Sequence, residues 1–270
     1  MEYFIRVEPG VNVFVHDINP QGRKTILFLH GWPLSHKMFE YQYNQLVSDG
    51  FRCIGMDCRG YGNSDKPLWG YDYNRLSDDV RGVIEAFRLQ DITLAGHSTG
   101  GAVAIRYMAR HNGYGVSRLV LLAAAAPSLI KRPYFPYGQD KETIEGFIRE
   151  TYNNRPALLK EFGEMLFYGT VNQPIADWLF QIGLQATGWS TAAVERSWLD
   201  EEQLFYDLGR VNVPTLILHS IHDRVCLFPL GEAQKQGIRN SRLVPFENSG
   251  HGLFWQEHDK VNREMKAFIG

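Results

Sequence analysis

Ser98 stands in a sequence context that can make a serine nucleophilic. It is the centre of the string G-H-S-T-G, residues 96–100, directly after an apolar run and directly before a helical pattern. A serine on such a tight strand-to-helix turn exposes its hydroxyl above the edge of a sheet, near a helix N-terminus. The glycines suit this turn because side chains would clash where strand and helix approach each other. The pattern predicts nucleophilic chemistry at Ser98.

A serine hydroxyl needs a base that takes its proton and an acid that orients the base. Asp223 and His251 each follow a later apolar run, where loops at the sheet edge would place them. His251 is predicted to take the Ser98 proton and return it to a leaving alcohol, while Asp223 sets the imidazole tautomer. Glu247 and Asp207 are rival acids. The predicted catalytic residues are Ser98, Asp223 and His251.

Acyl transfer also needs two donors for the oxyanion that forms in the transition state. One predicted donor is the backbone N–H of Thr99, immediately after the nucleophile. The other is the backbone N–H of Trp32, in the string H-G-W-P that follows the apolar run 25–29. The Trp32 indole is predicted to form one wall of the substrate pocket, with Pro33 beside it. No cofactor is expected for this chemistry.

The elements that would position these residues alternate between strands and helices. Short apolar runs without polar alternation are typical of strands buried on both faces, and helical patterns lie between them. This order predicts an α/β fold with a mostly parallel sheet and helices on both faces. An antiparallel hairpin is expected at 2–8 and 11–17. The predicted sheet strands are 25–29, 52–56, 91–95, 118–122, 214–218 and 242–246, and the predicted helices are 37–48, 76–88, 99–110 and 255–268.

About 80 residues interrupt this alternation between the runs at 118–122 and 214–218. A structureless loop of that length would be implausible in a compact domain, and helical patterns fill it at 141–152, 157–167, 175–184 and 191–199. We therefore expect a helical cap, 127–209, inserted into a core domain made of 1–126 and 210–270. The cap is rich in aromatic residues, and part of this excess should line the site beneath it. Its aromatic residues include Tyr134, Tyr137, Trp178, Trp189 and Trp198, and the sequence does not indicate which of them face the pocket.

The overall composition narrows the range of partners. The net charge of −2 gives no electrostatic reason to expect nucleic acid or an anionic membrane. The sequence shows no signal-peptide pattern at its start and no apolar stretch long enough to span a bilayer. Three cysteines without metal-binding spacing fit buried, reduced thiols. A cytoplasmic enzyme that acts on a small molecule, without a metal, is the expectation.

Four strings together carry a narrower resemblance. They are H-G-W-P-L-S at 30–35, D-C-R-G-Y-G-N-S-D-K-P at 57–67, G-H-S-T-G-G at 96–101 and G-H-G-L-F at 250–254. In these strings the chain resembles the α/β-hydrolase family of bacterial aryl esterases and cofactor-free haloperoxidases, also called perhydrolases. The resemblance implies hydrolysis of short-chain or aryl esters through an acyl-enzyme, with a side activity in which hydrogen peroxide replaces water. It also associates Pro33 with that side activity.

Two other functions stay open at this point. Serine enzymes of the same fold also cleave lactones or carbon–carbon bonds, and an intact triad does not exclude them. A ligand-sensing receptor that retains the triad is the alternative outside enzymology. A dehalogenase or an epoxide hydrolase would need aspartate where this chain has Ser98.

Overall fold

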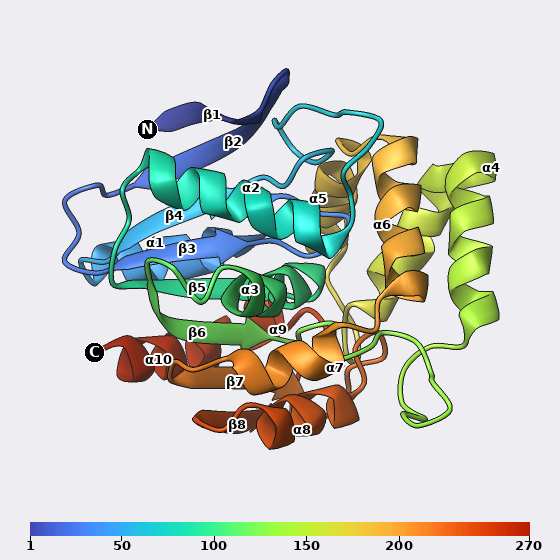
Figure 1. Cartoon of the computed structure of the whole chain (residues 1–270). Coiled ribbons are helices and arrows are strands. Elements are labelled where there is room, and N and C mark those ends of the chain that lie inside the picture. The colour runs from blue at the N-terminus through green and yellow to red at the C-terminus, as the bar shows by residue number, and fades with distance from the viewer.

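The computed structural model describes residues 1–270 and contains one eight-stranded sheet in the order β1-β2-β4-β3-β5-β6-β7-β8 (Figure 1). The first two strands form the expected antiparallel hairpin, and β2 also pairs antiparallel with β4. All other pairings are parallel, which confirms the predicted sheet. The strands are β1 Glu2–Glu8, β2 Val11–Ile18, β3 Thr25–Leu29, β4 Arg52–Met56, β5 Ile92–His97, β6 Val116–Leu122, β7 Thr215–Ser220 and β8 Ser241–Phe246.

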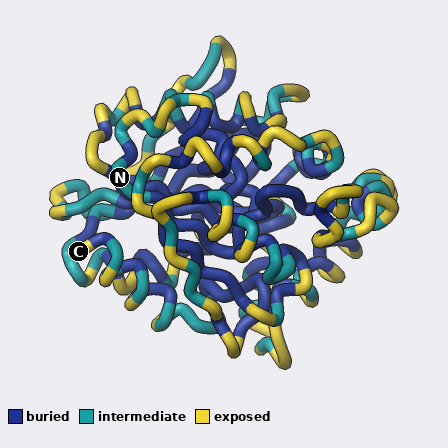
Figure 2. The backbone as a smooth tube through the Cα atoms, turned by 60° about the horizontal axis from the view of Figure 1, so that its bottom comes forward, coloured by how far each residue is buried: buried dark blue, intermediate teal, exposed yellow.

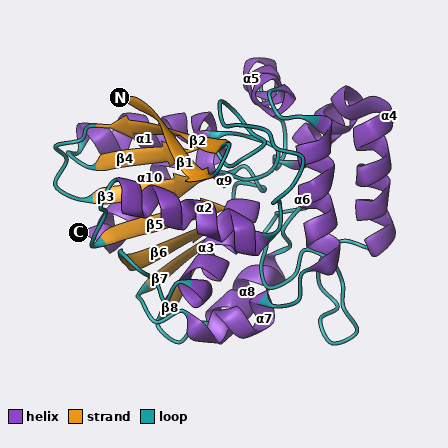
Figure 3. Ribbon diagram, turned by 45° about the horizontal axis from the view of Figure 1, so that its top comes forward, coloured by secondary structure: helices purple, strands orange, loops and turns teal.

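Helices cover both faces of this sheet, which is why its central strands read as continuous apolar runs. Figures 1 and 3 show α2, α3, α7 and α8 on one face and α1 and α10 on the other. The helices of these two layers are α1 Glu40–Ser48, preceded by the short turn η1 His36–Phe39, α2 Tyr73–Ala86, α3 Thr99–Arg110, α7 Leu204–Asp207, continued by η2 Leu208–Arg210, α8 Phe228–Gly237, α9 Leu253–Gln256 and α10 His258–Ile269. Figure 2 shows the buried backbone in the middle of the molecule, with exposed segments around it.

The predicted cap segment contains three longer helices, α4 Lys141–Met165, α5 Gln173–Leu184 and α6 Gly188–Asp200. They stand at the right-hand end of the sheet in Figure 1, and we call them the cap helices. Helix α4 consists of two helical pieces that meet at a kink at Asn154, two residues before Pro156, in agreement with the two helical patterns at 141–152 and 157–167. The Asn154 side chain accepts a hydrogen bond from the Ala157 amide, so it caps the second half of the helix.

The chain returns from the cap helices to the sheet through a buried ion cluster on α3. Arg106 donates to Asp207 at 2.5 Å, to Glu201 at 2.6 Å and to the side-chain oxygen of Asn74 at 2.7 Å. Two of these partners, Glu201 and Asp207, belong to the segment that leaves the cap. Asp207, a rival candidate for the catalytic acid, therefore pairs with Arg106 and not with His251.

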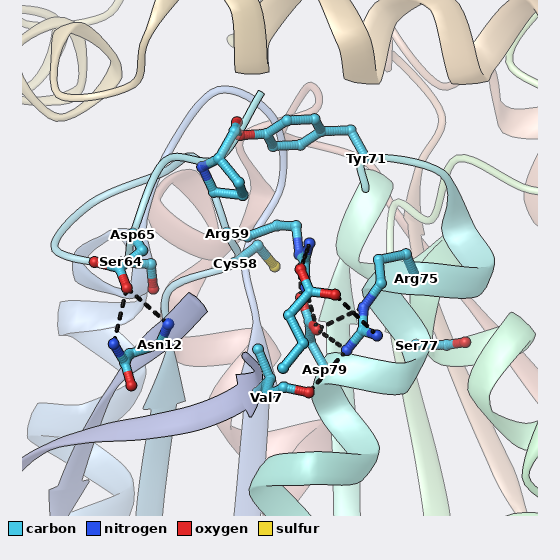
Figure 4. Close-up of polar contacts among 12 residues, drawn as sticks. Val7, Asn12, Cys58, Arg59, Ser64, Asp65, Tyr71, Arg75, Ser77 and Asp79 are labelled. Carbon is cyan, nitrogen blue, oxygen red and sulfur yellow. Dashed lines mark hydrogen bonds and ion pairs between the residues drawn. The ribbon is translucent and has the colours of Figure 1, made fainter. Parts of the chain in front are cut away.

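A second buried ion cluster holds the loop after β4 (Figure 4). The Arg59 side chain is fully buried and donates two hydrogen bonds to Asp79 of α2, at 2.5 and 2.7 Å, and one to Glu8 of β1 at 2.7 Å. Arg75 donates to the same Asp79 carboxylate and to the Val7 carbonyl. The cluster therefore ties β1 and α2 to the loop that carries the second of the four resemblance strings.

Replacing Arg59 by methionine should leave the buried Asp79 carboxylate short of its main partner. We expect the free energy of unfolding to fall by about 3 kcal/mol, because Arg75 alone then binds the buried Asp79 carboxylate, and loss of one partner of a buried pair costs far more than an exposed ion pair contributes. Urea unfolding of Arg59→Met measures this. Arg81→Met, which removes the more exposed pair with Glu85 on the same helix, is the control and should cost about 0.5 kcal/mol. Equal losses in the two variants would contradict the prediction.

Candidate active site

Ser98 occupies a strained backbone position between β5 and α3. Its φ is 53° and its ψ is −121°, a conformation that residues with a side chain rarely adopt. Neighbouring glycines make the turn possible: a Cβ on Gly96 would lie 2.4 Å from the Gly100 carbonyl oxygen, and a Cβ on Gly100 would lie 2.3 Å from the Leu29 carbonyl oxygen. Strain of this kind persists where the surrounding structure enforces it, and it is concentrated at functional sites.

Asp223 and His251 form a buried pair at the ends of β7 and β8. The Nδ1 atom of His251 lies 2.8 Å from Oδ2 of Asp223, and neither side chain is exposed to solvent. The other carboxylate oxygen accepts hydrogen bonds from the amides of Val225 and Cys226, at 2.8 and 2.9 Å. An aspartate held in this way orients the imidazole and places the proton on Nδ1, so that Nε2 is left as the basic atom.

Ser98 lies beside this pair without a hydrogen bond to it. Its Oγ atom is 4.0 Å from the Cys226 Sγ atom, and the Cys226 amide is the one that binds the Asp223 carboxylate. The His251 Nε2 atom is buried and has no hydrogen-bond partner. Catalytic hydrogen bonds are often long or misaligned in free enzymes and shorten when substrate binds. The structure thus brings the three predicted residues into one cluster, with the base unoccupied by another donor.

Two further histidines support the cluster through backbone contacts. The Nε2 atom of His97 lies 3.0 Å from the His251 carbonyl oxygen, and the two rings pack at 4.6 Å between centroids. Burial lowers the pKa of His97 well below its ordinary value, so the ring is neutral and can donate to that carbonyl. His30 lies under the loop after β3 and accepts a hydrogen bond from the Cys58 amide at 3.0 Å. The rival acid Glu247 is on the surface and pairs with Lys260.

The two predicted oxyanion donors flank Ser98 with free backbone N–H groups. Thr99 is the first residue of α3, so its N–H has no partner within the helix. The Trp32 amide, in the loop after β3, donates no hydrogen bond. This loop packs closely against the turn that carries Ser98, which we call the elbow (residues 96–100). A Cβ on Gly31 would lie 3.0 Å from the Ser98 Cβ and 2.6 Å from the His97 ring. Glycine is therefore needed directly before Trp32.

Comparison with known proteins identifies the family of this chain. The model of the alpha/beta hydrolase family matches residues 26–264. The chain belongs to the alpha/beta hydrolase family.

The chain is 47% identical to the AB hydrolase superfamily protein YisY of Bacillus subtilis, over 99% of both chains. It is 30% identical to the bifunctional esterase/perhydrolase DCH of Acinetobacter calcoaceticus, over 98% of this chain and 99% of that protein. An esterase from Exiguobacterium antarcticum has a solved structure with a TM-score of 0.96 and 38% identity, covering 100% and 99% of the two chains.

These relatives confirm the resemblance predicted from the four sequence strings, at the level of the family. In this hydrolase the strings lie around Ser98: the first forms the loop after β3, the second the loop after β4, the third the elbow and the fourth the loop that carries His251. Strings far apart in the sequence converge because the carboxyl ends of parallel strands meet at one edge of the sheet.

A narrow apolar cavity opens beside Ser98 of the hydrolase, between the sheet edge and the cap helices. Trp32 forms one wall and packs edge to face on Trp198 and on Phe162, with centroids 5.1 and 4.7 Å apart. Sequence reasoning expected cap aromatics here but could not tell which, and Tyr134, Tyr137 and Trp189 are exposed instead. The lining residues are Trp32, Ser98, Leu129, Gln139, Ile144, Phe147, Phe162, Met165, Trp198 and Val225.

Pro33 is buried next to this cavity but is not one of its lining residues. It lies under the cap helix α5, where a Cβ added to Gly183 would be 3.4 Å from the proline Cγ atom. Pro33 therefore contacts the cap, while Trp32 contacts the cavity.

The remaining sulfur and acidic groups of this hydrolase form no cluster of three or more that could hold a metal ion. Its three cysteines are free and buried, as predicted. Burial raises the pKa of Cys53 to about 12, so that thiol is not ionised at neutral pH. No helix combines the length and the apolar character needed to cross a membrane.

Proposed function

We propose that this hydrolase cleaves small carboxylic esters through a covalent acyl-enzyme on Ser98. The Ser98 oxygen attacks the ester carbonyl while His251 Nε2 takes its proton, and the same proton then goes to the leaving alcohol. Asp223 keeps the imidazole oriented and stabilises its charged form. The backbone N–H groups of Trp32 and Thr99 stabilise the oxyanion. Water, activated by His251, then releases the acid.

One observation carries this proposal: a strained serine lies beside a buried His251–Asp223 pair whose basic Nε2 has no other partner. A strained turn of this kind has no evident packing purpose, and the Nε2 atom without a partner leaves the His251 imidazole free to accept a proton. The relatives named as an esterase and as an esterase/perhydrolase support the same reaction.

The shape of the cavity indicates which acyl groups fit. The free space beside Ser98 is narrow, and apolar side chains, several of them aromatic, close its walls. We expect kcat/KM for p-nitrophenyl esters to be highest for acetate to butanoate and to fall by at least about tenfold by octanoate. Release of p-nitrophenolate across this series measures it. A rate that keeps rising to octanoate would contradict the assignment of this cavity as the acyl pocket.

Covalent labelling tests the reaction itself. We expect a p-nitrophenyl alkylphosphonate to inactivate the enzyme, and mass spectrometry of the digested protein to place one phosphonyl group on Ser98. Ser48→Ala, which changes an exposed serine of α1, should be labelled like the parent, and Ser98→Ala should not be labelled. Hydrolysis of p-nitrophenyl acetate without labelling of Ser98 would refute the acyl-enzyme. No hydrolysis of any ester in the series would refute the ester substrate.

We further propose that hydrogen peroxide can replace water in the second step. Its attack on the acyl-enzyme carbonyl expels Ser98 and forms a peracid, with no metal required. The named esterase/perhydrolase supports this side activity. Pro33 is proposed to favour it because the proline ring restricts the backbone that carries the Trp32 carbonyl next to the elbow.

Replacing Pro33 by leucine should therefore lower the ratio of peracid formed to acid formed, several-fold, while ester hydrolysis by water continues. Oxidation of a halide-coupled dye measures the peracid, and p-nitrophenolate release from the same ester measures acyl-enzyme formation. An unchanged ratio in Pro33→Leu would show that the proline has no part in the choice between water and peroxide.

A further inference from the structure

Two tryptophan N–H groups at the acyl cavity have no hydrogen-bond partner. Trp32 and Trp198 are only 3% and 4% exposed, and the Nε1 atom of each is buried without an acceptor. The two rings meet edge to face and line the same cavity beside Ser98. Buried indole N–H groups usually find a partner, since an unsatisfied donor loses its hydration without compensation.

The other cavity walls do not supply that partner. Eight of the ten lining residues are hydrophobic. The amide nitrogen of Gln139 is itself a donor and is already bound to the carbonyls of Arg224 and Val225, at 2.8 and 3.1 Å. The cavity walls are therefore mostly apolar, and no residue in them accepts a hydrogen bond from the Trp198 indole N–H. Trp32 also borders a second narrow cavity, so the inference rests mainly on Trp198.

We propose that the acyl group of the natural substrate carries an oxygen within its chain, as an ether, ketone or hydroxyl, which accepts a hydrogen bond from the Trp198 indole N–H. This rests on the proposed ester hydrolysis and narrows its substrate class. A site built to bind a substrate oxygen disfavours the all-carbon analogue, because the protein donor then stays unpaired. Trp198, supplied by the cap helix α6, would thus determine specificity without touching the reacting atoms.

Pairs of esters of matched shape test this directly. p-Nitrophenyl methoxyacetate has the shape of the butanoate, and the 3-methoxypropanoate has the shape of the pentanoate, with one CH₂ replaced by oxygen. For each pair we measure the ratio of kcat/KM for the ether ester to that for the alkyl ester. In Trp198→Phe, which keeps an aromatic ring but removes the N–H, this ratio should fall about tenfold in at least one pair. Intrinsic reactivity and the fraction of folded protein cancel in the comparison.

Two further variants make the result specific. Trp69→Phe changes an exposed tryptophan and should leave both ratios as in the parent. Trp32→Phe reports on the second donor. Equal ratios in the parent and Trp198→Phe, or a fall confined to Trp32→Phe, would overturn the assignment to Trp198 while leaving ester hydrolysis intact. Absence of turnover of every ester by the parent would instead refute the proposed function, and this inference with it.

Discussion

Ser98→Ala is expected to lower kcat for p-nitrophenyl acetate by a factor of about 10⁴ to 10⁶, with little change in KM. Alanine cannot form the acyl-enzyme, and the oxyanion donors that remain retain only a small part of the acceleration. The backbone of the elbow is set by its glycines and by the hydrogen bond from the Ser98 amide to the Leu122 carbonyl, so the fold should persist.

The kcat and KM of the purified variant are measured from p-nitrophenolate release. Circular dichroism of the same protein shows whether the fold persists, so that a loss of activity can be told apart from unfolding. Asp223→Asn provides an independent check, because it preserves shape but disturbs the His251 tautomer, and a loss of about 10⁴ is expected. The two losses should not add in the double variant, since the residues act as one unit. A Ser98→Ala protein that retained more than about one hundredth of the parental activity would show that another residue carries the reaction.

Glu195 should make the stability of the fold strongly dependent on pH. This glutamate of α6 is fully buried, and its only side-chain partner is the Thr151 hydroxyl of α4, at 3.0 and 3.2 Å from its two carboxyl oxygens. Burial raises the pKa of Glu195 to about 8, and the Thr151 hydrogen bond and the Arg196 charge oppose this only in part. The carboxyl group is thus neutral in the folded chain at pH 7.

The direction of the pH effect follows from proton binding. The unfolded chain releases the Glu195 proton near pH 4.3, while the folded chain keeps it until about pH 8. Between these values the free energy of unfolding should fall as pH rises, by up to about 1.4 kcal/mol per pH unit. The stability contributed by the neutral carboxyl is complete below pH 4 and lost by about pH 8, on the order of 5 kcal/mol in all.

Glu195→Gln removes this ionisation and keeps a hydrogen-bonding group opposite Thr151. We expect the variant to be increasingly more stable than the parent from pH 5 to pH 8.5, as measured by urea unfolding at each pH. Glu161→Gln, at an exposed position on α4, is the matched control and should give a constant difference. If the Glu195→Gln and parent curves run parallel across this pH range, Glu195 is ionised in the folded chain at neutral pH.

The sheet and the residues at its edge could be predicted because each depends on a local pattern. Apolar runs mark β3 to β8, and the strings at their ends carry Ser98, Asp223 and His251. Helix α8 was not predicted, since Pro229 and two glycines within ten residues weaken the helical pattern. Helix α7 was not predicted either, because its four residues are too few to show a helical pattern.

Contacts between distant residues left no such pattern. Arg59 pairs with Asp79, 20 residues away in the sequence, and Arg106 pairs with Asp207, 101 residues away. The residues around one member of such a pair do not indicate that an opposite charge elsewhere in the chain will be buried beside it. The same holds for the cavity. Five aromatic residues of the cap stood out in the sequence, but only their packing decides that Trp198 faces Ser98 while Tyr134 faces solvent.

The ion cluster on α3 limits how this enzyme can diversify. Helix α3 begins at the elbow and carries Arg106 further along, where Glu201 and Asp207 meet it at the exit from the cap helices. A segment that replaced the cap helices would change what lines the cavity, while the loops that carry Ser98, Asp223 and His251 stay the same. Any transplanted segment must still end in an acidic residue that reaches Arg106. Otherwise the buried Arg106 cation is left without an acidic partner on the helix that begins next to Ser98.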